Sequence, residues 1–389
     1  MKTLLLEEII DPLPLLLPKI KTLVSLLNSS KNPLVFTGAG ISTSSGIPDY
    51  RSSYKTSLKT GPGVWESEEN RIKYKGNPVI KPAIECYPTK THMALKKLLE
   101  KGRISHILTQ NVDNLHTRSG VCEQYLTELH GNICKEICET CHHVFYRDYY
   151  VKPRNSDPLE VYTGRNCEIC QGKLKKTLVN FGEKINEEKL RKSQEFAEKC
   201  DFCLCLGSSF RVNPAAKFPK QFSGKKLVVV NLQRNILENI ANLSIYGLCD
   251  EIMEAFMKEL GEEIEEFRVK KSFLLEFYQE KHGVSLKISG KIPGFYDKDF
   301  YNIEELEVFD LENKEFFLRK EGDFTIDLKE NVKKLKVILK FFGNFMEPNA
   351  VISVDLSEEV FINKGLKLGF SCVLDDFFQE WEIRKFQVF

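Results

Sequence analysis

No apolar run in this sequence of 389 residues is both long enough and free enough of charge to cross a bilayer, so we expect no membrane-spanning helix. The leucine-rich start is interrupted by acidic residues and prolines and has no small-residue cleavage site after it, so we expect no signal peptide. The net charge of +1 gives no overall attraction to nucleic acid or membrane, and no clear basic localisation cluster stands out. With 42% apolar and 29% charged residues, the composition is that of an ordinary globular protein.

The cysteines lack the pattern of a secreted disulfide scaffold, although there are 12 of them. Four stand in two C-x-x-C pairs, Cys138 with Cys141 and Cys167 with Cys170, separated by 25 residues. Four thiolates in two such pairs predict a tetrahedral zinc site that is closed to further ligands and is therefore structural rather than catalytic. The stretch between the pairs is predicted to be a small β-rich insert that zinc would stabilise.

The length of the chain predicts two or three folding units. We expect a helical extension over residues 1–33, an α/β domain over residues 34–261 with the zinc module at about residues 131–177, and an antiparallel β-rich domain over residues 265–389. The last region holds most of the phenylalanines and has alternating stretches such as residues 351–356, which is typical of a sandwich. It shows no catalytic constellation, so packing or the binding of an unidentified partner is its expected role.

The first strand of the α/β domain leads into a glycine-rich turn. An apolar run, residues 34–36, is followed by Gly38, Ala39 and Gly40, and glycines at a strand-to-helix turn let backbone N–H groups approach a pyrophosphate. The Ser/Thr-rich residues 41–46 are expected to begin the helix. The third glycine comes only at Gly46, later than in G-x-G-x-x-G, so a tight turn after a core strand is an equally good interpretation.

Three later apolar runs also end in polar or glycine residues. Residues 105–108 lead into Thr109–Asp113, residues 202–206 into Gly207–Ser209, and residues 227–230 into Asn231–Gln233. In an open parallel sheet, ligands bind outside the carboxyl ends of the strands. The four runs together predict a parallel, Rossmann-like sheet with one nucleotide site at that edge.

Residues 109–116, T-Q-N-V-D-N-L-H, are too polar for a core and too short for a helix of their own. Their Asn and Asp side chains have two interpretations of equal weight: caps of the following helix, or partners of ribose hydroxyls and an amide-bearing ligand. His130 stands in H-G-N just before the zinc module, and the glycine after it would let another segment approach closely. An imidazole with a pKa near neutrality is suited to act as general base on a hydroxyl.

Two further stretches each have two interpretations. Residues 178–183 form either a strand that returns from the zinc insert to the sheet or an edge that pairs with an extended peptide. Residues 52–65 are predicted to form a loop that could close over the nucleotide, with Trp65 either as a cover or as part of a local core.

Together these motifs resemble those of the sirtuins, the NAD-dependent protein deacylases, over roughly residues 30–260 and in family order. The similar segments are G-A-G-I-S-T-S-S-G-I-P-D-Y-R at residues 38–51, T-Q-N-V-D-N-L-H, H-G-N, the four cysteines, F-G-E at residues 181–183 and the G-S-S turn. Tyr50 stands where phenylalanine is commoner, and Asn114 replaces the usual glycine. G-P-G-V-W at residues 61–65, V-V-N-L-Q and Y-G-L-C-D most resemble the nuclear or nucleolar class IV members, although residues 52–60 are longer than in that class.

The resemblance implies that NAD is consumed as a co-substrate. The acyl-lysine oxygen attacks the ribose as nicotinamide leaves, His130 acts as general base on a ribose hydroxyl, and free lysine and an acylated ADP-ribose result. Asn111 and Asp113 would order the nicotinamide-ribose region and act in catalysis with His130. The NAD-binding residues would be these two together with Gly38, Ala39, Gly40, Thr43, Asp49, Tyr50, Arg51, Trp65, Gln110, Gly207, Ser208, Ser209, Asn231, Gln233 and Cys249.

The peptide would be flanked by Val179, Phe181, Gly182 and Val212, and Cys138, Cys141, Cys167 and Cys170 would hold one structural Zn²⁺. The implied partner is an acylated-lysine protein or peptide, with histone tails as an example and with chromatin association through other proteins. The implied location is the nucleus, with the cytoplasm as the alternative and no membrane association.

Other functions stay open from the sequence alone. A protein mono-ADP-ribosyltransferase on the same scaffold ranks second, because an acceptor side chain could take the ADP-ribose. A catalytically weak binding scaffold that works through the C-terminal domain ranks third. An NAD-linked oxidoreductase ranks last, because it would not need the zinc module beside H-G-N and would convert NAD into NADH.

Overall fold

The computed structural model describes residues 7–147, 149–155, 160–221, 225–268, 270–280, 283–289, 303–311, 315–320, 325–328, 333–341, 350–358, 365–374 and 381–387. The chain forms two compact units: residues 1–145 with 151–267, and residues 268–389 with the short segment 146–150. No helix in the described parts of the chain is long and apolar enough to cross a membrane.

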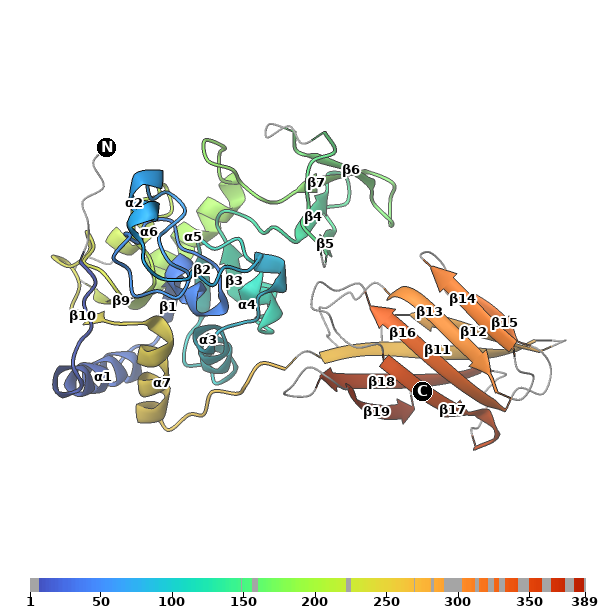
Figure 1. The fold of residues 1–389 in the computed structure, drawn as a ribbon. Helices are drawn as coiled ribbons and strands as arrows, with labels where there is room; N and C mark the ends of the chain where they lie inside the picture. The colour runs from blue at the N-terminus through green and yellow to red at the C-terminus, as the bar shows by residue number, and fades with distance from the viewer. Residues whose placement is uncertain are drawn as a thin grey trace. The chain divides into compact units, whose positions relative to one another are not determined.

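The first unit is built on a six-stranded parallel sheet with the order β10-β9-β8-β1-β2-β3 (Figure 1). Its strands are β1 (Pro33–Thr37), β2 (His106–Thr109), β3 (Leu126–Glu128), β8 (Phe202–Leu206), β9 (Lys226–Asn231) and β10 (Leu243–Tyr246). The chain adds strands on one side of β1 up to β3 and on the other side from β8 onward. The order therefore reverses between β1 and β8, which is the position where parallel sheets of this type bind their ligands.

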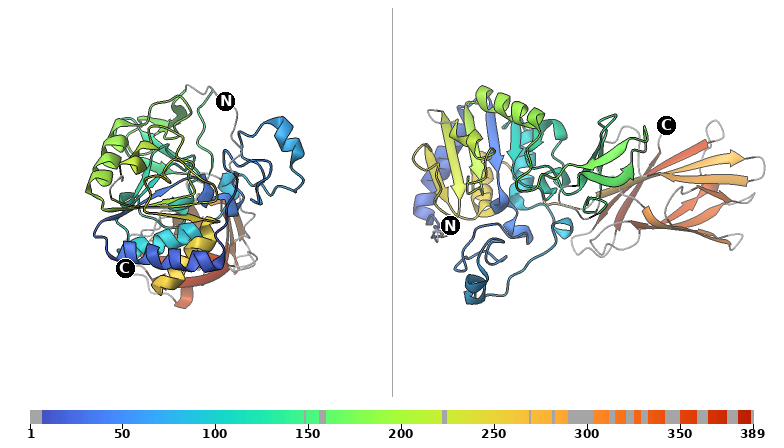
Figure 2. Two further views of the ribbon diagram at one scale, coloured as in Figure 1. Left: turned by 90° about the vertical axis from the view of Figure 1, so that its left-hand side faces the viewer. Right: turned by 90° about the horizontal axis from the view of Figure 1, so that it is seen from above.

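Helices cover both faces of this sheet (Figure 2). On one face lie α1 (Leu13–Asn28), α3 (Lys90–Glu100) and α7 (Cys249–Leu260), and on the other lie α5 (Glu187–Lys199) and α6 (Lys217–Lys220). Alternate strand residues enter the two cores: Val35 faces α1, α3 and α7, whereas Leu34 and Phe36 face α5 and α6. The predicted parallel α/β fold is confirmed, and the all-buried strands explain why their sequences are continuous apolar runs.

Two details of this unit differ from the prediction. Residues 41–46 do not begin an α-helix but form two 3₁₀ turns, Ala39–Ile41 and Thr43–Ser45, ended by Gly46 with φ of +103°. Serine and threonine have poor helix propensity because their side chains bond to nearby backbone, as Thr43 does to the Gly40 carbonyl and Ser45 to the Ser42 carbonyl. Strand β3 was missed, because a three-residue strand that ends in a glutamate gives almost no apolar signal.

The zinc module is a four-stranded sheet with the order β5-β4-β7-β6. Its strands are β4 (Lys135–Cys138), β5 (Val144–Tyr146), β6 (Tyr162–Asn166) and β7 (Lys173–Lys176). Among its described residues, the apolar core cluster consists of Cys138, Phe145, Cys167 and Leu174, which is too little to stabilise a domain without a metal or disulfide. Residues 178–183 leave the module without joining a strand, so the prediction of a returning strand is wrong.

The short helices α2 (Glu68–Lys73) and α4 (Leu115–Arg118) lie on loops of the first unit, as do the 3₁₀ turns Ala83–Glu85 and Glu123–Tyr125. Ser67 caps α2 by accepting a hydrogen bond from the Asn70 N–H. Residues 52–65 contain neither helix nor strand, which confirms the predicted loop.

The second unit consists of two antiparallel sheets, with the orders β15-β12-β11-β18-β19 and β14-β13-β16-β17. The strands are β11 (Lys270–Glu280), β12 (Gly283–Ser289), β13 (Ile303–Asp310), β14 (Glu315–Lys320), β15 (Thr325–Leu328), β16 (Lys334–Phe341), β17 (Ala350–Asp355), β18 (Gly365–Leu374) and β19 (Trp381–Gln387), and the 3₁₀ turn Leu356–Glu358 follows β17. Alternate residues are buried, such as Leu335, Val337 and Leu339 in β16, so each sheet has one apolar face. The predicted antiparallel β-rich C-terminal region is confirmed.

Candidate active site

Two glycine-rich loops meet where the strand order reverses. The Gly38 N–H donates to the Leu206 carbonyl (3.0 Å) and the Gly40 N–H to the Gly207 carbonyl (2.8 Å). A Cβ on Gly38 would lie 2.7 Å from Gly207 O, and one on Gly40 would lie 2.7 Å from Gly207 Cα. Gly207 itself has φ of +61°. The contact between the two loops therefore requires these glycines, whether or not a phosphate also approaches them.

A buried polar cluster lies against these loops. The Asn111 amide donates to Gly38 O (3.1 Å) and to Ser42 Oγ (3.2 Å), and the Ser42 hydroxyl donates to Asp113 Oδ2 (2.7 Å). The other carboxylate oxygen of Asp113 accepts the Leu115 N–H (3.0 Å), so Asp113 also holds the first turn of α4. Burial raises the pKa of the Asp113 carboxyl above its ordinary value, while the hydrogen bonds from Leu115 and Ser42 oppose that shift. The bond to Leu115 agrees with the helix-cap interpretation of residues 109–116, and the ligand-binding interpretation stays a prediction.

His130 lies at the end of this cluster, in the turn after β3. Its Nδ1 faces the Gln110 carbonyl at 2.9 Å, and because a carbonyl only accepts, Nδ1 carries the proton. Nε2 is then the basic nitrogen. Burial lowers the pKa of His130, the bond to Gln110 opposes this, and the nearby Lys189 ammonium lowers it further. The imidazole is therefore neutral near pH 7, as a general base must be.

Gln110 has a side chain that the protein does not fully satisfy. Its Oε1 accepts from the Ser208 hydroxyl (3.1 Å), while Nε2 is buried and has no hydrogen-bond partner among the described residues. Its backbone N–H donates to Thr37 O (3.0 Å), so it extends the pairing of β2 with β1. A buried N–H group without a partner is costly, and a polar ligand at this edge would remove that cost.

The loop after the first turn contributes an aromatic cluster that is partly exposed. The rings of Tyr50 and Trp65 lie 5.0 Å apart, and Trp65 and Phe181 also lie 5.0 Å apart. The Arg51 guanidinium lies 4.4 Å from the centre of the Trp65 ring and donates to Ser209 Oγ (3.1 Å). Burial lowers the pKa of Arg51, with the Arg211 charge as the next cause. Trp65 is 45% exposed, so it is not part of a local core. Through Trp65 and Phe181, the cluster joins the predicted cofactor loop, residues 52–65, to the predicted peptide segment, residues 178–183.

The remaining predicted site residues lie in several parts of the first unit. Thr43, Asn231 and Gln233 lie at the carboxyl edge, where the Asn231 amide donates to Gln233 O (2.7 Å). Asp49 organises the loop, since its carboxylate accepts from the N–H and the hydroxyl of Ser52 (3.0 and 2.6 Å), and burial raises its pKa. Ala39 lies in the first 3₁₀ turn, Cys249 is buried in the first turn of α7, Gly182 has φ of +90°, and Val212 is half-buried in the loop after β8.

Burial raises the pKa of the Cys249 thiol to about 12, so this cysteine is neutral and unsuited to act as a nucleophile. Val179 donates its N–H to the His130 carbonyl (2.9 Å), which brings the predicted peptide segment directly against the predicted base. Gly131 has φ of +76°, and a Cβ on it would lie 1.8 Å from Thr177 O. The glycine of H-G-N thus allows the close approach that was expected.

The four predicted zinc ligands come together. Their sulfur atoms all lie within 4.8 Å of one another, with Cys138 Sγ 3.4 Å from Cys170 Sγ and Cys141 Sγ 3.6 Å from Cys167 Sγ. All four are free thiols. A zinc ion with Zn–S bonds of about 2.3 Å separates its sulfurs by about 3.8 Å in a tetrahedron, so the donor set fits zinc. The cluster supplies four ligands and keeps no open position, so its role is structural.

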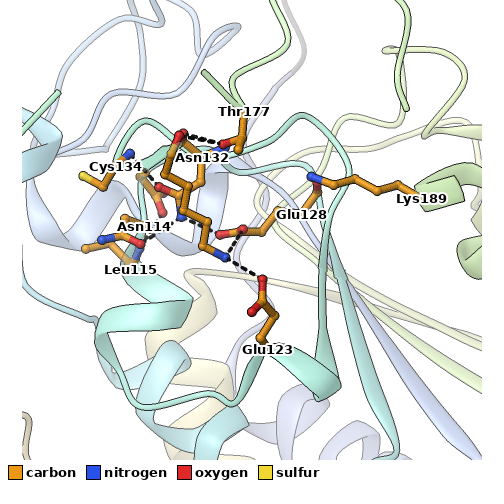
Figure 3. A network of polar contacts seen from close by, with 10 residues as sticks. Asn114, Leu115, Glu123, Glu128, Asn132, Cys134, Thr177 and Lys189 are labelled. Atoms are coloured by element: carbon orange, nitrogen blue, oxygen red, sulfur yellow. Dashed lines mark hydrogen bonds and ion pairs between the residues drawn. The ribbon is translucent and has the colours of Figure 1, made fainter. Parts of the chain in front are cut away.

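A polar network that the sequence did not reveal is centred on Asn132, two residues after His130 in the chain (Figure 3). The Asn132 amide donates to Glu128 Oε1 (2.6 Å) and to Asn114 Oδ1 (2.8 Å), and its own Oδ1 accepts the Cys134 N–H (2.7 Å). The Thr177 hydroxyl donates to the Asn132 carbonyl (3.1 Å). Asn132 therefore ties the end of β3, the N-terminus of α4, and both the entry and the exit of the zinc module to one another.

Two lysines complete this network. Lys135 Nζ lies 2.7 Å from Glu128 Oε2 and 3.6 Å from Glu123 Oε1, and the side chains of Lys135 and Glu128 are only 6% and 7% exposed. Lys189 on α5 donates to the Glu128 carbonyl (3.0 Å), and burial lowers its pKa while the Glu128 charge raises it. No spacing rule connects these residues, so the sequence gives no signal for the network.

Comparisons with known proteins identify the family of this chain. The model of the Sir2 family matches residues 38–214. An NAD-dependent protein deacetylase of Thermodesulfovibrio yellowstonii is 31% identical over 261 residues, which are 63% of this chain and 96% of that protein. The chain belongs to the Sir2 family. The predicted resemblance to the sirtuins is confirmed.

Larger sirtuins match as well. The NAD-dependent protein deacetylase SRT1 of Arabidopsis thaliana is 35% identical over 267 residues, 67% of this chain and 53% of that protein. Mouse NAD-dependent protein deacetylase sirtuin-7 is 37% identical over 275 residues, 66% of this chain and 63% of that protein, in agreement with the predicted class IV resemblance. This sirtuin thus spans less than two thirds of either relative. A solved structure titled "Sir2-p53 peptide-NAD+" is 32% identical, with a TM-score of 0.47, and the match covers 62% of this chain and 99% of that one.

Proposed function

We propose that this sirtuin is an NAD-dependent protein lysine deacylase, which converts an acyl-lysine and NAD into lysine, nicotinamide and O-acyl-ADP-ribose. The observation that carries the proposal is the placement of His130. Its Nδ1–H is fixed on the Gln110 carbonyl, its Nε2 is left basic, and its own carbonyl binds the N–H of Val179 in the peptide segment. The base thus lies between the residues proposed for NAD and those proposed for the peptide.

The residues at the carboxyl edge fit NAD as a substrate. The orphaned amide of Gln110 offers a donor, and the loops of Gly38 and Gly207 place backbone at the position where the strand order reverses. The Asn111–Asp113 cluster would offer its polar groups to the ribose region of NAD. Neutral His130 would accept the proton of a ribose hydroxyl as that oxygen attacks the acyl-derived carbon. The relatives in plants, mammals and bacteria are all named NAD-dependent protein deacetylases.

The exposed rings of Tyr50, Trp65 and Phe181 would flank the acyl-lysine where it enters. Tyr50 is 36% exposed and Phe181 is 67% exposed, so apolar surface is available on both the loop and the peptide segment. We propose an acylated tail of a nuclear protein, such as a histone, as the substrate and the nucleus as the location, by analogy with the class IV members. Association with chromatin would then pass through partner proteins.

Mass spectrometry of an acetyl-lysine histone peptide, incubated with and without NAD, tests the activity. We expect NAD-dependent loss of the acetyl group together with acetylated ADP-ribose, both abolished in His130→Ala. His142→Asn is the matched control, because His142 is exposed and has φ of +57°, which asparagine tolerates. Protein-borne ADP-ribose without deacylation would favour the transferase. If neither acetyl nor longer acyl groups are removed and no protein-borne ADP-ribose forms, the scaffold would be favoured.

A further inference from the structure

A short N-terminal segment, residues 8–11, runs across the carboxyl ends of β9 and β10. The Ile9 N–H donates to the Leu232 carbonyl (2.8 Å), and Glu8 forms an isolated antiparallel bridge with Gln233. The Asp11 N–H donates to the Tyr246 carbonyl, and the Asp11 carboxylate accepts the Tyr246 N–H, both at 2.9 Å. The segment is therefore anchored at both ends, and it places Glu8 beside Gln233, a residue that we propose for NAD binding.

The Glu8 carboxylate is bound by the loop between residues 52 and 65 rather than by a cation. Its Oε1 accepts the Thr56 hydroxyl (2.5 Å), and its Oε2 accepts the Ser57 N–H (2.8 Å) and the Ser57 hydroxyl (2.7 Å). Among the described residues no Lys or Arg forms an ion pair with Glu8. Three donors from two consecutive residues hold one carboxylate, and bonds of this charged type are the strong class of hydrogen bond.

The same loop is closed at its base. The Gly63 N–H donates to Ser52 O (2.8 Å), and the Trp65 N–H donates to Tyr50 O (3.0 Å). A Cβ on Gly63 would lie 2.3 Å from Arg51 N, so the close approach of these two backbone segments leaves no room for a side chain at position 63. Residues 53–62 thus form a loop that is closed at its base. Tyr50, Arg51 and Trp65 lie at this base, which we call the neck, and Glu8 binds the far part of the loop at Thr56 and Ser57.

We propose that Glu8 is a positioning residue for NAD. It fixes the far part of the loop to the edge of the sheet at Gln233 and thereby sets the place of Arg51 and Trp65 at the neck. The role rests on the part of the proposed function that assigns NAD binding to this site, and it does not depend on the chemistry at His130.

The test compares Glu8→Ala and the isosteric Glu8→Gln with Glu7→Gln, the exposed neighbouring carboxylate, in the full chain. We expect Glu8→Ala to raise the KM for NAD about tenfold, with kcat and the KM for the peptide within about twofold of Glu7→Gln. Hydrogen exchange of residues 52–60 should accelerate by about tenfold or more in Glu8→Ala. Thr56→Val should raise the KM for NAD less, and combining it with Glu8→Ala should add little, because the two groups share one bond.

Three results in Glu8→Ala would overturn the role: unchanged hydrogen exchange of residues 52–60, faster exchange with an unchanged KM for NAD, or a lower kcat without a higher KM for NAD. NAD titration by calorimetry separates this proposal from the deacylase proposal. If no deacylation occurs but NAD binds the wild type and binds Glu8→Ala more weakly, the deacylase proposal fails and the positioning role stands. If NAD does not bind the wild type, both fail.

Discussion

The buried pair of Lys135 and Glu128 gives the sharpest test of how the zinc module is joined to the sheet. We consider Lys135→Met, which keeps the length of the side chain and removes its charge. The ammonium lies 2.7 Å from the Glu128 carboxylate, and both side chains are less than a tenth exposed, at 6% and 7%. Glu128 would keep its bond from Asn132 but would lose the buried ammonium that forms an ion pair with it. Loss of one partner of a buried pair costs about 3–5 kcal/mol.

For a unit of this size, each kcal/mol lowers the Tm by about 2–4 °C, so we expect Lys135→Met to lower it by about 6–20 °C. The double variant Lys135→Met with Glu128→Gln should recover most of that loss, because a neutral amide needs no counter-charge and can still accept the bond from Asn132. The matched control is Lys192→Met, which breaks an exposed pair on α5 whose side chains are 53% and 64% exposed. Such pairs contribute about 0–1 kcal/mol.

Calorimetric unfolding of the full chain with zinc bound measures these shifts, with the transition of the first unit assigned by hydrogen exchange. The reasoning would be refuted if Lys135→Met unfolded at the same temperature as Lys192→Met. It would also be refuted if the double variant were as unstable as the single one, because the loss would then come from packing and not from an unpaired charge.

Three further predictions follow from the site. Since burial holds the pKa of His130 below 6.5 and the base must be neutral, kcat/KM for NAD should rise with pH and level off through a midpoint below 6.5; a midpoint above that value would contradict the assignment. Chelation of zinc should unfold residues 135–176 and abolish deacylation, as metal content and hydrogen exchange will show; protection that persists without metal would refute a structural zinc. Asn114→Gly should cost about 1 kcal/mol through the lost bond to Asn132, and Asn114→Ala about 2–3 kcal/mol because φ is +68°; equal thermal shifts would contradict this.

The parts of the fold that follow from local patterns were predictable. Continuous apolar runs identified four parallel strands with polar carboxyl ends, and the structure brings those ends together at one edge. The two C-x-x-C pairs identified the metal cluster, because ligand chemistry restricts the spacing of cysteines. The glycine-rich turns were also predicted, but only the approach of a phosphate was given as the reason for them. The structure adds a second reason, because the loops of Gly38 and Gly207 contact each other, and no single segment of the sequence encodes such a tertiary contact.

The rest depends on pairs of residues that are distant in the sequence. Lys135 and Glu128 make sense only together, and so do Asn114 and Asn132, since each one alone is merely a polar residue in a short element. Strand β3 was missed for this reason: Glu128 lowers its apolar character, and the compensating lysine comes from another sheet. Phe181 likewise gave no sign that its ring would meet Trp65 across the site.

His130 is held from two sides, and this couples the network to the chemistry. Its Nδ1–H binds the Gln110 carbonyl on the sheet, while its carbonyl binds the Val179 N–H just after the exit of the zinc module. A shift of that exit would therefore reach the imidazole through the backbone. We expect Lys135→Met to lower kcat at a temperature at which circular dichroism shows it fully folded, by about tenfold for a displacement well below 1 Å. Lys192→Met should keep the wild-type kcat. An unchanged kcat in folded Lys135→Met would show that the network supports stability alone and leaves the position of the base to Gln110.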